Sequence, residues 1–130
     1  MLPRLDVAMK AIDADCMNIA VKHAGEAPAR GDGKRVLVDR LWPRGRGKEA
    51  LKLHLWLREI APSTELRRWF GHDPAKWTQF RRRYFAELQR NAGVVKTLRG
   101  LCAKQSVTLV FAAADREHNN AVALREYLLR

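Results

Sequence analysis

The segment Val107–Ala113 (VTLVFAA) constrains the fold more than any other part of the chain. Every residue in it is apolar, aromatic or β-branched. A strand without a polar face has to be covered on both sides, as happens in a parallel sheet between two layers of other structure. The run is far too short to cross a bilayer, which takes about 20 apolar residues. It therefore predicts a doubly covered strand rather than a membrane span.

Two more strands are expected before it. Met17–His23 (MNIAVKH) alternates weakly between apolar and polar residues, and Arg35–Asp39 (RVLVD) is a short β-branched run that indicates a buried strand. Residues 51–57 place leucine at every second position, which predicts an edge strand with one wet face, although leucine also suits a helix. His23 and His54 lie on these predicted strands and are expected at the surface.

Helix signals separate and follow the strands. The sequence PSTE at residues 62–65 begins a short helix that Gly71 ends, and Asp73-Pro74 supplies an N-cap and a first-turn proline for the next helix. Two more helices are expected over residues 94–102 and from about Asn119 to the C-terminus. Apolar strands followed by helices predict an α/β fold, a compact single-domain sandwich with a small, mainly parallel sheet flanked by helices. The clearest apolar stripe, at spacings of three and four, is Trp77, Phe80, Tyr84 and Leu88.

The length of 130 residues fits one domain. We place it at residues 15–130, behind a flexible N-terminal leader at residues 1–14. Charged residues interrupt that leader, so it does not resemble a signal peptide. Cys16 and Cys102 form no CxxC pair, and such sparse use of cysteine suits a reducing compartment. We therefore expect a cytoplasmic protein.

The chain is strongly basic. It has 25 lysines and arginines against 14 aspartates and glutamates, a formal net charge of +11. This balance favours phosphates, nucleic acid or other anionic partners. The alternative is that most of these side chains form a solvated face. The sequence has no basic tail and no basic strip interleaved with exposed aromatics, so charge alone does not identify the partner.

The predicted topology selects two loops as a candidate site. In parallel sheets, ligands bind beyond the carboxyl ends of the strands, which here means residues 39–47 and 114–120. Arg40 and Arg44 lie in a turn that contains proline and glycine, and two guanidinium groups there can hold a phosphate or a carboxylate bidentately. For Arg40, a structural ion pair with a carboxylate is an equal alternative.

Five other polar residues belong to the candidate site. Asp39 ends a predicted strand and is expected to orient an arginine or, as the second alternative, to act as a base. Asp115 and His118 precede the last helix and are the candidate catalytic residues, with helix capping as the alternative role of Asp115. Asn119, which is also a natural cap residue, and His72 are candidate ligand-binding residues.

Three functional hypotheses follow. The first is a protein that binds or acts on a small anionic ligand, phosphorylated or nucleotide-like, and whether it is an enzyme stays open. The second is a nucleic-acid-associated accessory protein that uses the run Arg81–Arg83. The third is an interaction module whose edge strand at residues 51–57 pairs with a second copy or another chain. No metal and no cofactor are expected, because the histidines lack metal-ligand spacing and no glycine-rich nucleotide loop is present.

Four blocks of sequence resemble the domain-of-unknown-function 488 family. They are RVLVDRLWPRG, LWLREIAPSTELRRWFGHDP, WTQFRRRYFAEL and VTLVFAAADREHNNAVALREYL, and the resemblance runs from about Cys16 to Tyr127. It implies membership of a family of small bacterial and archaeal proteins, and it brings no settled activity with it. Longer relatives carry cysteines near the strand end, where this chain has Phe111–Asp115 and His118–Asn120. The resemblance therefore does not bring thiol chemistry or thiol metal ligation to this site.

Overall fold

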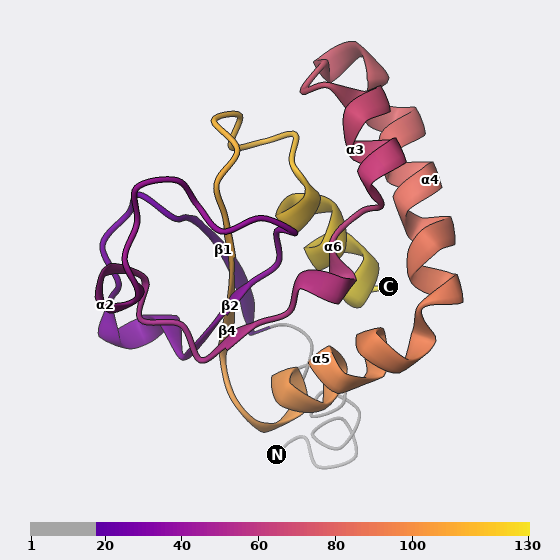
Figure 1. Ribbon diagram of the computed structural model, residues 1–130. Helices are drawn as coiled ribbons and strands as arrows, with labels where there is room; N and C mark the ends of the chain where they lie inside the picture. The colour runs from indigo at the N-terminus through magenta and orange to yellow at the C-terminus, as the bar shows by residue number, and fades with distance from the viewer. Residues whose placement is uncertain (1–17) are drawn as a thin grey trace, which may run out of the picture.

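The computed structural model describes residues 18–130, so the expected leader at residues 1–14 lies outside the described residues (Figure 1). Its centre is a four-stranded sheet in the order β1-β4-β2-β3, in which every neighbouring pair is parallel. The α/β class and the parallel sheet are confirmed. The strands are β1 (Ile19–His23), β2 (Lys34–Leu37), β3 (Leu55–Trp56) and β4 (Val107–Phe111).

The helices lie unequally on the two sides of the sheet. In Figure 1, α4, α5 and α6 lie on one side, whereas α2 and the connecting loops lie on the other. Within residues 18–130, no helix is long and apolar enough to cross a membrane. The helices are α2 (Lys48–Leu51), α3 (Thr64–Phe70), α4 (Trp77–Arg90), α5 (Ala92–Lys104) and α6 (Asn120–Leu128), with short 3-10 turns η1 (Arg30–Asp32), η2 (Arg58–Ile60) and η3 (Pro74–Lys76).

Strand β4 is the doubly covered strand that the sequence predicts. All five of its residues are buried. Leu109 faces the larger core, which the helices α4, α5 and α6 share, and Val110 faces a smaller core with Leu37 of β2 and Leu51 of α2. Because both faces are occupied, β4 has no place for an exposed polar residue, and this explains its sequence.

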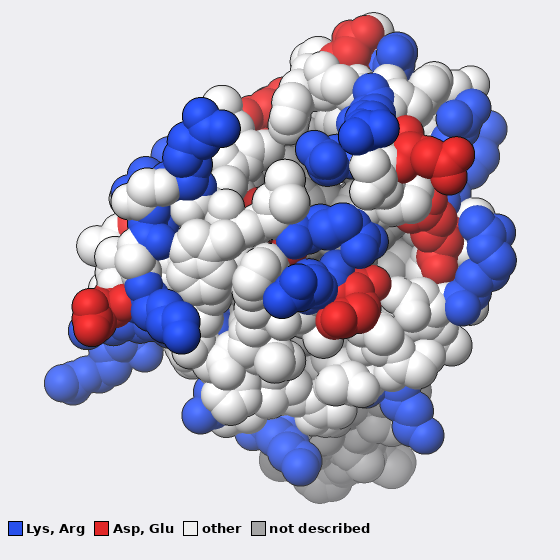
Figure 2. Space-filling model, in the orientation of Figure 1, with Lys and Arg blue, Asp and Glu red and all other residues white. Residues whose placement is uncertain are grey.

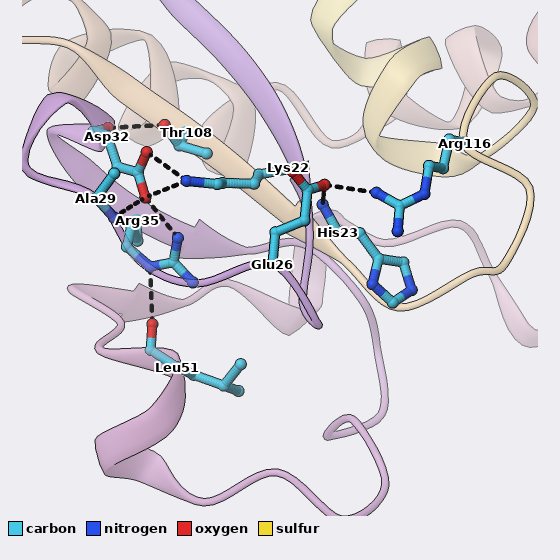
Figure 3. Close-up of polar contacts among 9 residues, drawn as sticks. All are labelled: Lys22, His23, Glu26, Ala29, Asp32, Arg35, Leu51, Thr108 and Arg116. Carbon is cyan, nitrogen blue, oxygen red and sulfur yellow. Dashed lines mark hydrogen bonds and ion pairs between the residues drawn. The ribbon is translucent and has the colours of Figure 1, made fainter.

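The thinner side of the sheet is completed by a buried polar network (Figure 3). The Asp32 carboxylate accepts from Lys22 Nζ at 3.0 Å and from Arg35 Nη1 at 2.7 Å, and Arg35 Nε donates to the carbonyl of Leu51 at 2.7 Å. Thr108 Oγ1 donates to the Asp32 carbonyl at 2.7 Å. Burial acts to raise the pKa of Asp32, but the hydrogen bonds from Ala29, Lys22 and Arg35 outweigh it, so the pKa is lowered and the carboxylate stays ionised. The network ties the loop before β2 to α2 and β4.

The predicted helix ends are confirmed. Ser63 caps α3 by accepting from the backbone N–H of Leu66 at 3.1 Å, and Gly71 ends that helix in the left-handed region with φ +54°. Asp73 caps the next turn by accepting from Ala75 N at 3.0 Å, with proline at the first position.

The strand predicted at residues 51–57 is wrong over its first half. Leu51 ends α2, and Lys52 follows in a left-handed conformation with φ +46°. Strand β3 is confined to Leu55–Trp56 at the edge of the sheet. The alternating leucines therefore belong to a buried helix end followed by a short strand. Leucine fits both structures, so period alone did not separate them.

The surface position expected for His54 is confirmed, whereas His23 is half-buried. Its Nε2 lies 3.1 Å from the carbonyl oxygen of Ala112, and its Nδ1 accepts from the backbone N–H of Gly25 at 2.8 Å. Both ring nitrogens are therefore used to connect the loop after β1 with the end of β4.

The stripe on α4 packs into the larger core, where Phe80, Tyr84 and Leu88 are buried. The Tyr84 hydroxyl donates to the carbonyl of Ile60 at 2.7 Å in the interior. This bond fixes the η2 turn, which leads into α3, against α4.

We expect Tyr84→Phe to lower the free energy of unfolding by about 1–2 kcal/mol, because the buried Ile60 carbonyl loses its donor. Tyr127→Phe is the matched control, since Tyr127 is half-buried on α6. Urea unfolding of both variants measures the difference. Equal effects of the two substitutions would contradict the assigned role of the Tyr84 hydroxyl.

Candidate functional site

A pocket of about 270 Å³ lies at the carboxyl edge of the sheet. Segments far apart in the sequence meet there: the loop after β2, the end of α3, the loop after β4 and the first turn of α6. In Figure 1 the loop after β4 and the end of α3 lie toward the top of the view, and the first turn of α6 lies below them, near its centre. The pocket is lined by Asp39, Arg40, Leu41, Trp42, Ala61, Pro62, Arg67, Phe70, His72, Phe80, Ala112, Ala113, Asn119 and Asn120.

The structure brings four of the seven sequence-predicted site residues into this pocket: Asp39, Arg40, His72 and Asn119. Asp115 and His118 lie in the loop that leads to Asn119 but do not line the pocket. Arg44 is exposed and also lies outside the lining. The roles assigned to these residues from sequence stay predictions.

Asp39 joins the ends of the two central strands. Its Oδ2 accepts from the backbone N–H of Ala112, just after β4, at 2.9 Å. Its Oδ1 accepts from Asn120 Nδ2 at 3.0 Å, and the same amide nitrogen donates to the carbonyl of Val38 at 2.9 Å. Asp39 thus holds amide groups, where the sequence favoured an arginine. The reason is the parallel sheet, which brings the end of β4 alongside the end of β2.

The environment of Asp39 opposes its charge. Burial raises the pKa of its carboxyl, while the hydrogen bonds from Asn120 and Ala112 and the positive charge of Arg67 offset part of the shift. Both oxygens already accept hydrogen bonds from the protein. An Asp39 in this state is suited to hold the wall of the pocket and is less suited to remove a proton.

Arg40 lines the pocket without a carboxylate partner. Its Nη2 donates to the carbonyls of Ala61 at 3.2 Å and Pro62 at 3.3 Å. Its Nε is buried and makes no hydrogen bond within the described residues. The expected alternative of an ion pair with a carboxylate is therefore replaced by contacts to backbone carbonyls, which leave the positive charge of Arg40 uncompensated by direct pairing.

Arg67 is the pocket residue that sequence reasoning missed. It lies on α3 three residues before Phe70, so one helix face places a cation and an aromatic ring in the same lining. That spacing is the signal that could have identified it, but many surface arginines on helices share the pattern. Arg67 is exposed, whereas Phe70 is buried.

His72 is held at the pocket by an unusual backbone conformation. Gly71 and His72 are both left-handed, with φ +54° and +58°. A non-glycine residue adopts this region at a cost, so the sharp turn after α3 is held by its surroundings. The His72 ring centroid lies 6.4 Å from that of Phe70.

Asn119 is a helix cap. Its Oδ1 accepts from the backbone N–H of Val122 at 3.0 Å, and its Nδ2 donates to the carbonyl of Asp115 at 2.9 Å. With both ends of the buried amide engaged, the capping role accounts for Asn119 and positions the first turn of α6 at the pocket.

Asp115 and His118 form a pair beside the pocket. His118 Nδ1 lies 2.9 Å from Asp115 Oδ2, and the other carboxylate oxygen accepts from the backbone N–H groups of Glu117 and His118. The Glu117 N–H and the His118 side chain hold the pKa of Asp115 below its ordinary value. The His118 ring lies edge-on to Trp77, with centroids 5.3 Å apart. Asp115 thus fixes the backbone of this loop, and His118 packs the loop against Trp77 of α4.

The turn that carries Arg44 is folded by its own contacts. Trp42 Nε1 donates to the carbonyl of Arg46 at 2.6 Å, and the Trp42 ring packs edge-on against Trp56 with centroids 5.4 Å apart. This arrangement packs Trp42 against the smaller core. It leaves Arg44 exposed near the tip of the turn.

Positive side chains are spread rather than gathered on the face in Figure 2, where aspartate and glutamate lie among them. The run Arg81–Arg83 is divided by its contacts. Arg81 pairs with Glu126, whereas the Arg83 guanidinium carbon lies 4.2 Å from the ring centroid of Trp69. Nucleic-acid binding by these three arginines stays a prediction. Within residues 18–130, no group of three or more potential metal-ligating side chains comes together.

We expect Asn120→Ala to lower the free energy of unfolding by about 1–3 kcal/mol, because two carbonyl-type acceptors lose their donor. The loss also depends on pH. A carboxyl whose folded pKa is raised favours the fold when it is protonated and loses this contribution as the pH rises through the folded pKa. Removing the Asn120 hydrogen bond raises the pKa of Asp39 further, so the penalty is expected to grow as the pH rises through the folded pKa of Asp39, which lies above the ordinary value of 3.8.

Urea unfolding of the wild-type protein and Asn120→Ala between pH 4 and pH 7 measures this dependence. In an Asp39→Asn background the penalty is expected to be the same at each pH. A penalty in the wild-type background that does not change with pH would show that Asn120 and Asp39 are not coupled.

Comparison with known proteins places the chain among relatives of similar length. The uncharacterised protein YeaO of Escherichia coli is 41% identical over 112 residues, which cover 86% of this chain and 97% of YeaO. The uncharacterised protein Rv3073c of Mycobacterium tuberculosis is 39% identical over 97 residues, which cover 75% of this chain and 81% of that protein. No solved structure matches this chain.

The sequence profile described as the inactive DUF488-N3 subclade matches residues 18–130. This range contains the sheet, the helices and every residue of the pocket. The chain therefore belongs to the DUF488 family, within the subclade described as inactive.

Proposed function

We propose that this protein binds a small anionic molecule reversibly in the pocket at the carboxyl edge of its sheet, without converting it. The observation that carries the proposal is the presence of Arg40 and Arg67 in one pocket lining. Guanidinium groups pair well with carboxylates and phosphates, and such charge-assisted hydrogen bonds are about twice as strong as neutral ones. The phosphorylated or nucleotide-like ligand expected from sequence is one form of this proposal.

The first turn of α6 supports the same proposal. Asn119 caps the backbone N–H of Val122 through its side chain, and its carbonyl accepts from Ala123 N at 3.2 Å. The N–H groups of Asn120 and Ala121 come before Val122 and Ala123 at the beginning of α6, and such groups have no acceptor inside the helix. Asn119 and Asn120 line the pocket, so the positive end of the helix dipole adds to the two arginines.

Binding without chemistry is favoured by how the polar groups of the pocket are used. Asp39 and Asn119 are engaged in hydrogen bonds that hold the fold, and His118 lies outside the lining. His72 does line the pocket, but within residues 18–130 its ring contacts Phe70 and has no carboxylate partner to orient or activate it. General acid–base chemistry needs a group within hydrogen-bond reach of the ligand. The description of the matched subclade as inactive agrees with a role in which no bond is broken.

Thermal shifts at high ionic strength with sulfate, inorganic phosphate, AMP and benzoate test the proposal, because salt screens binding to exposed charges. We expect at least one of these anions to stabilise the wild-type protein. Arg67→Ala is expected to weaken the binding of that anion about tenfold or more, because one charge-assisted hydrogen bond contributes about 1.5–3 kcal/mol. Arg68→Ala, the matched control on the same helix, is expected to bind as the wild type does.

If Arg67→Ala and Arg68→Ala weakened anion binding equally, general surface charge would explain the binding, and the proposal would be contradicted. Arg44→Ala is the third variant. It tests the role predicted from sequence, because a loss there requires that the turn at residues 40–47 contact the bound anion.

A further inference from the structure

We infer that the ligand of this pocket is a carboxylate monoanion with a compact apolar body, such as an aromatic carboxylate, rather than a phosphate ester. The inference rests on the proposed function and narrows its ligand class. Three independent properties of the pocket lead to it: its charge, its lining and its size.

The charge of the lining fits one negative charge better than two. Arg40 and Arg67 are positive and Asp39 is negative, which leaves a formal charge of +1. Asp39 is fixed in place by Ala112 and Asn120, so it cannot turn away from an incoming anion. A phosphate monoester carries about −1.5 to −2 at pH 7, so its charge would exceed the net formal charge of the lining and would be repelled by this carboxylate.

The lining offers an apolar surface beside the cations. Phe70 and Phe80 stack with ring centroids 4.3 Å apart and form part of the wall. Leu41, also in the lining, is 62% exposed, and it is the more exposed of the two large hydrophobic residues that remain open to solvent within residues 18–130. An apolar ligand body that covers Leu41 and Trp42 would remove this surface from water, whereas a sugar phosphate would not.

The size of the pocket favours a compact ligand. Sites that enclose a drug-sized molecule have volumes of about 300–1,000 Å³. At about 270 Å³ the pocket lies just below that range. It suits a single ring with one charged group and leaves little room for a base, a sugar and a phosphate together.

Isothermal titration calorimetry with benzoate, acetate, inorganic phosphate and AMP tests this inference on the complete chain. We expect benzoate to bind more tightly than acetate, because the ring adds apolar contact, and more tightly than phosphate and AMP, because of the charge. Arg67→Ala is expected to weaken the binding of benzoate about tenfold. Leu41→Ala is expected to weaken the binding of benzoate by about three- to tenfold and to leave the affinity for acetate unchanged.

Leu129→Ala is the matched control, because Leu129 is the other exposed leucine within residues 18–130 and lies outside this pocket. Tighter, Arg67-dependent binding of phosphate or AMP would overturn this inference and leave the proposed function standing. Benzoate binding that neither Arg67→Ala nor Leu41→Ala changes would overturn it as well, because the ligand would then lie elsewhere. Failure of all four anions to bind would overturn both the inference and the proposed function.

Discussion

The burial of β4 on both faces is the constraint on which the rest of this fold depends. Its five residues lie between a large core formed by α4, α5 and α6 and a small core beneath α2. The Asp32 network lies beside the small core, where the loop before β2 brings the Asp32 carboxylate into the interior. That carboxylate is tolerated because Lys22 and Arg35 supply opposite charge and the backbone N–H of Ala29 donates to it.

The same constraint creates the pocket. Parallel pairing of β4 with β2 aligns the carboxyl ends of both strands, and the chain must leave them as loops. The backbone N–H of Ala112 and the carbonyl of Val38 then need partners, which Asp39 and Asn120 provide. The wall of the pocket and the junction of the two strands are therefore made of the same side chains. A substitution at Asp39 or Asn120 changes stability and pocket shape together, whereas Arg67 is free of this double role.

Much of the fold could be predicted from sequence, because its signals are local. The apolar run of β4, the Ser63 and Asp73 caps and the Gly71 helix end each depend on a few adjacent residues, and each is found where it was expected. The strand at residues 51–57 was wrong because leucine at alternate positions fits a helix end equally well. The hydrogen bonds of His23 join residues far apart in the chain, and no local pattern reports such contacts.

The candidate site was predictable as a location and less so as a set of residues. The rule that ligands bind at strand carboxyl ends selected Asp39, Arg40 and Asn119, and these three residues line one pocket. It could not include Arg67, whose place depends on how α3 packs against α4. Nor could it show that Asn119 is engaged by the helix it caps, because a cap and a ligand contact call for the same residue type. The residues most free to meet a ligand are therefore those that the fold itself does not use. In this pocket they are an exposed arginine on α3 and an exposed leucine at the rim, and the proposed selectivity for an anion with an apolar body rests on these two residues.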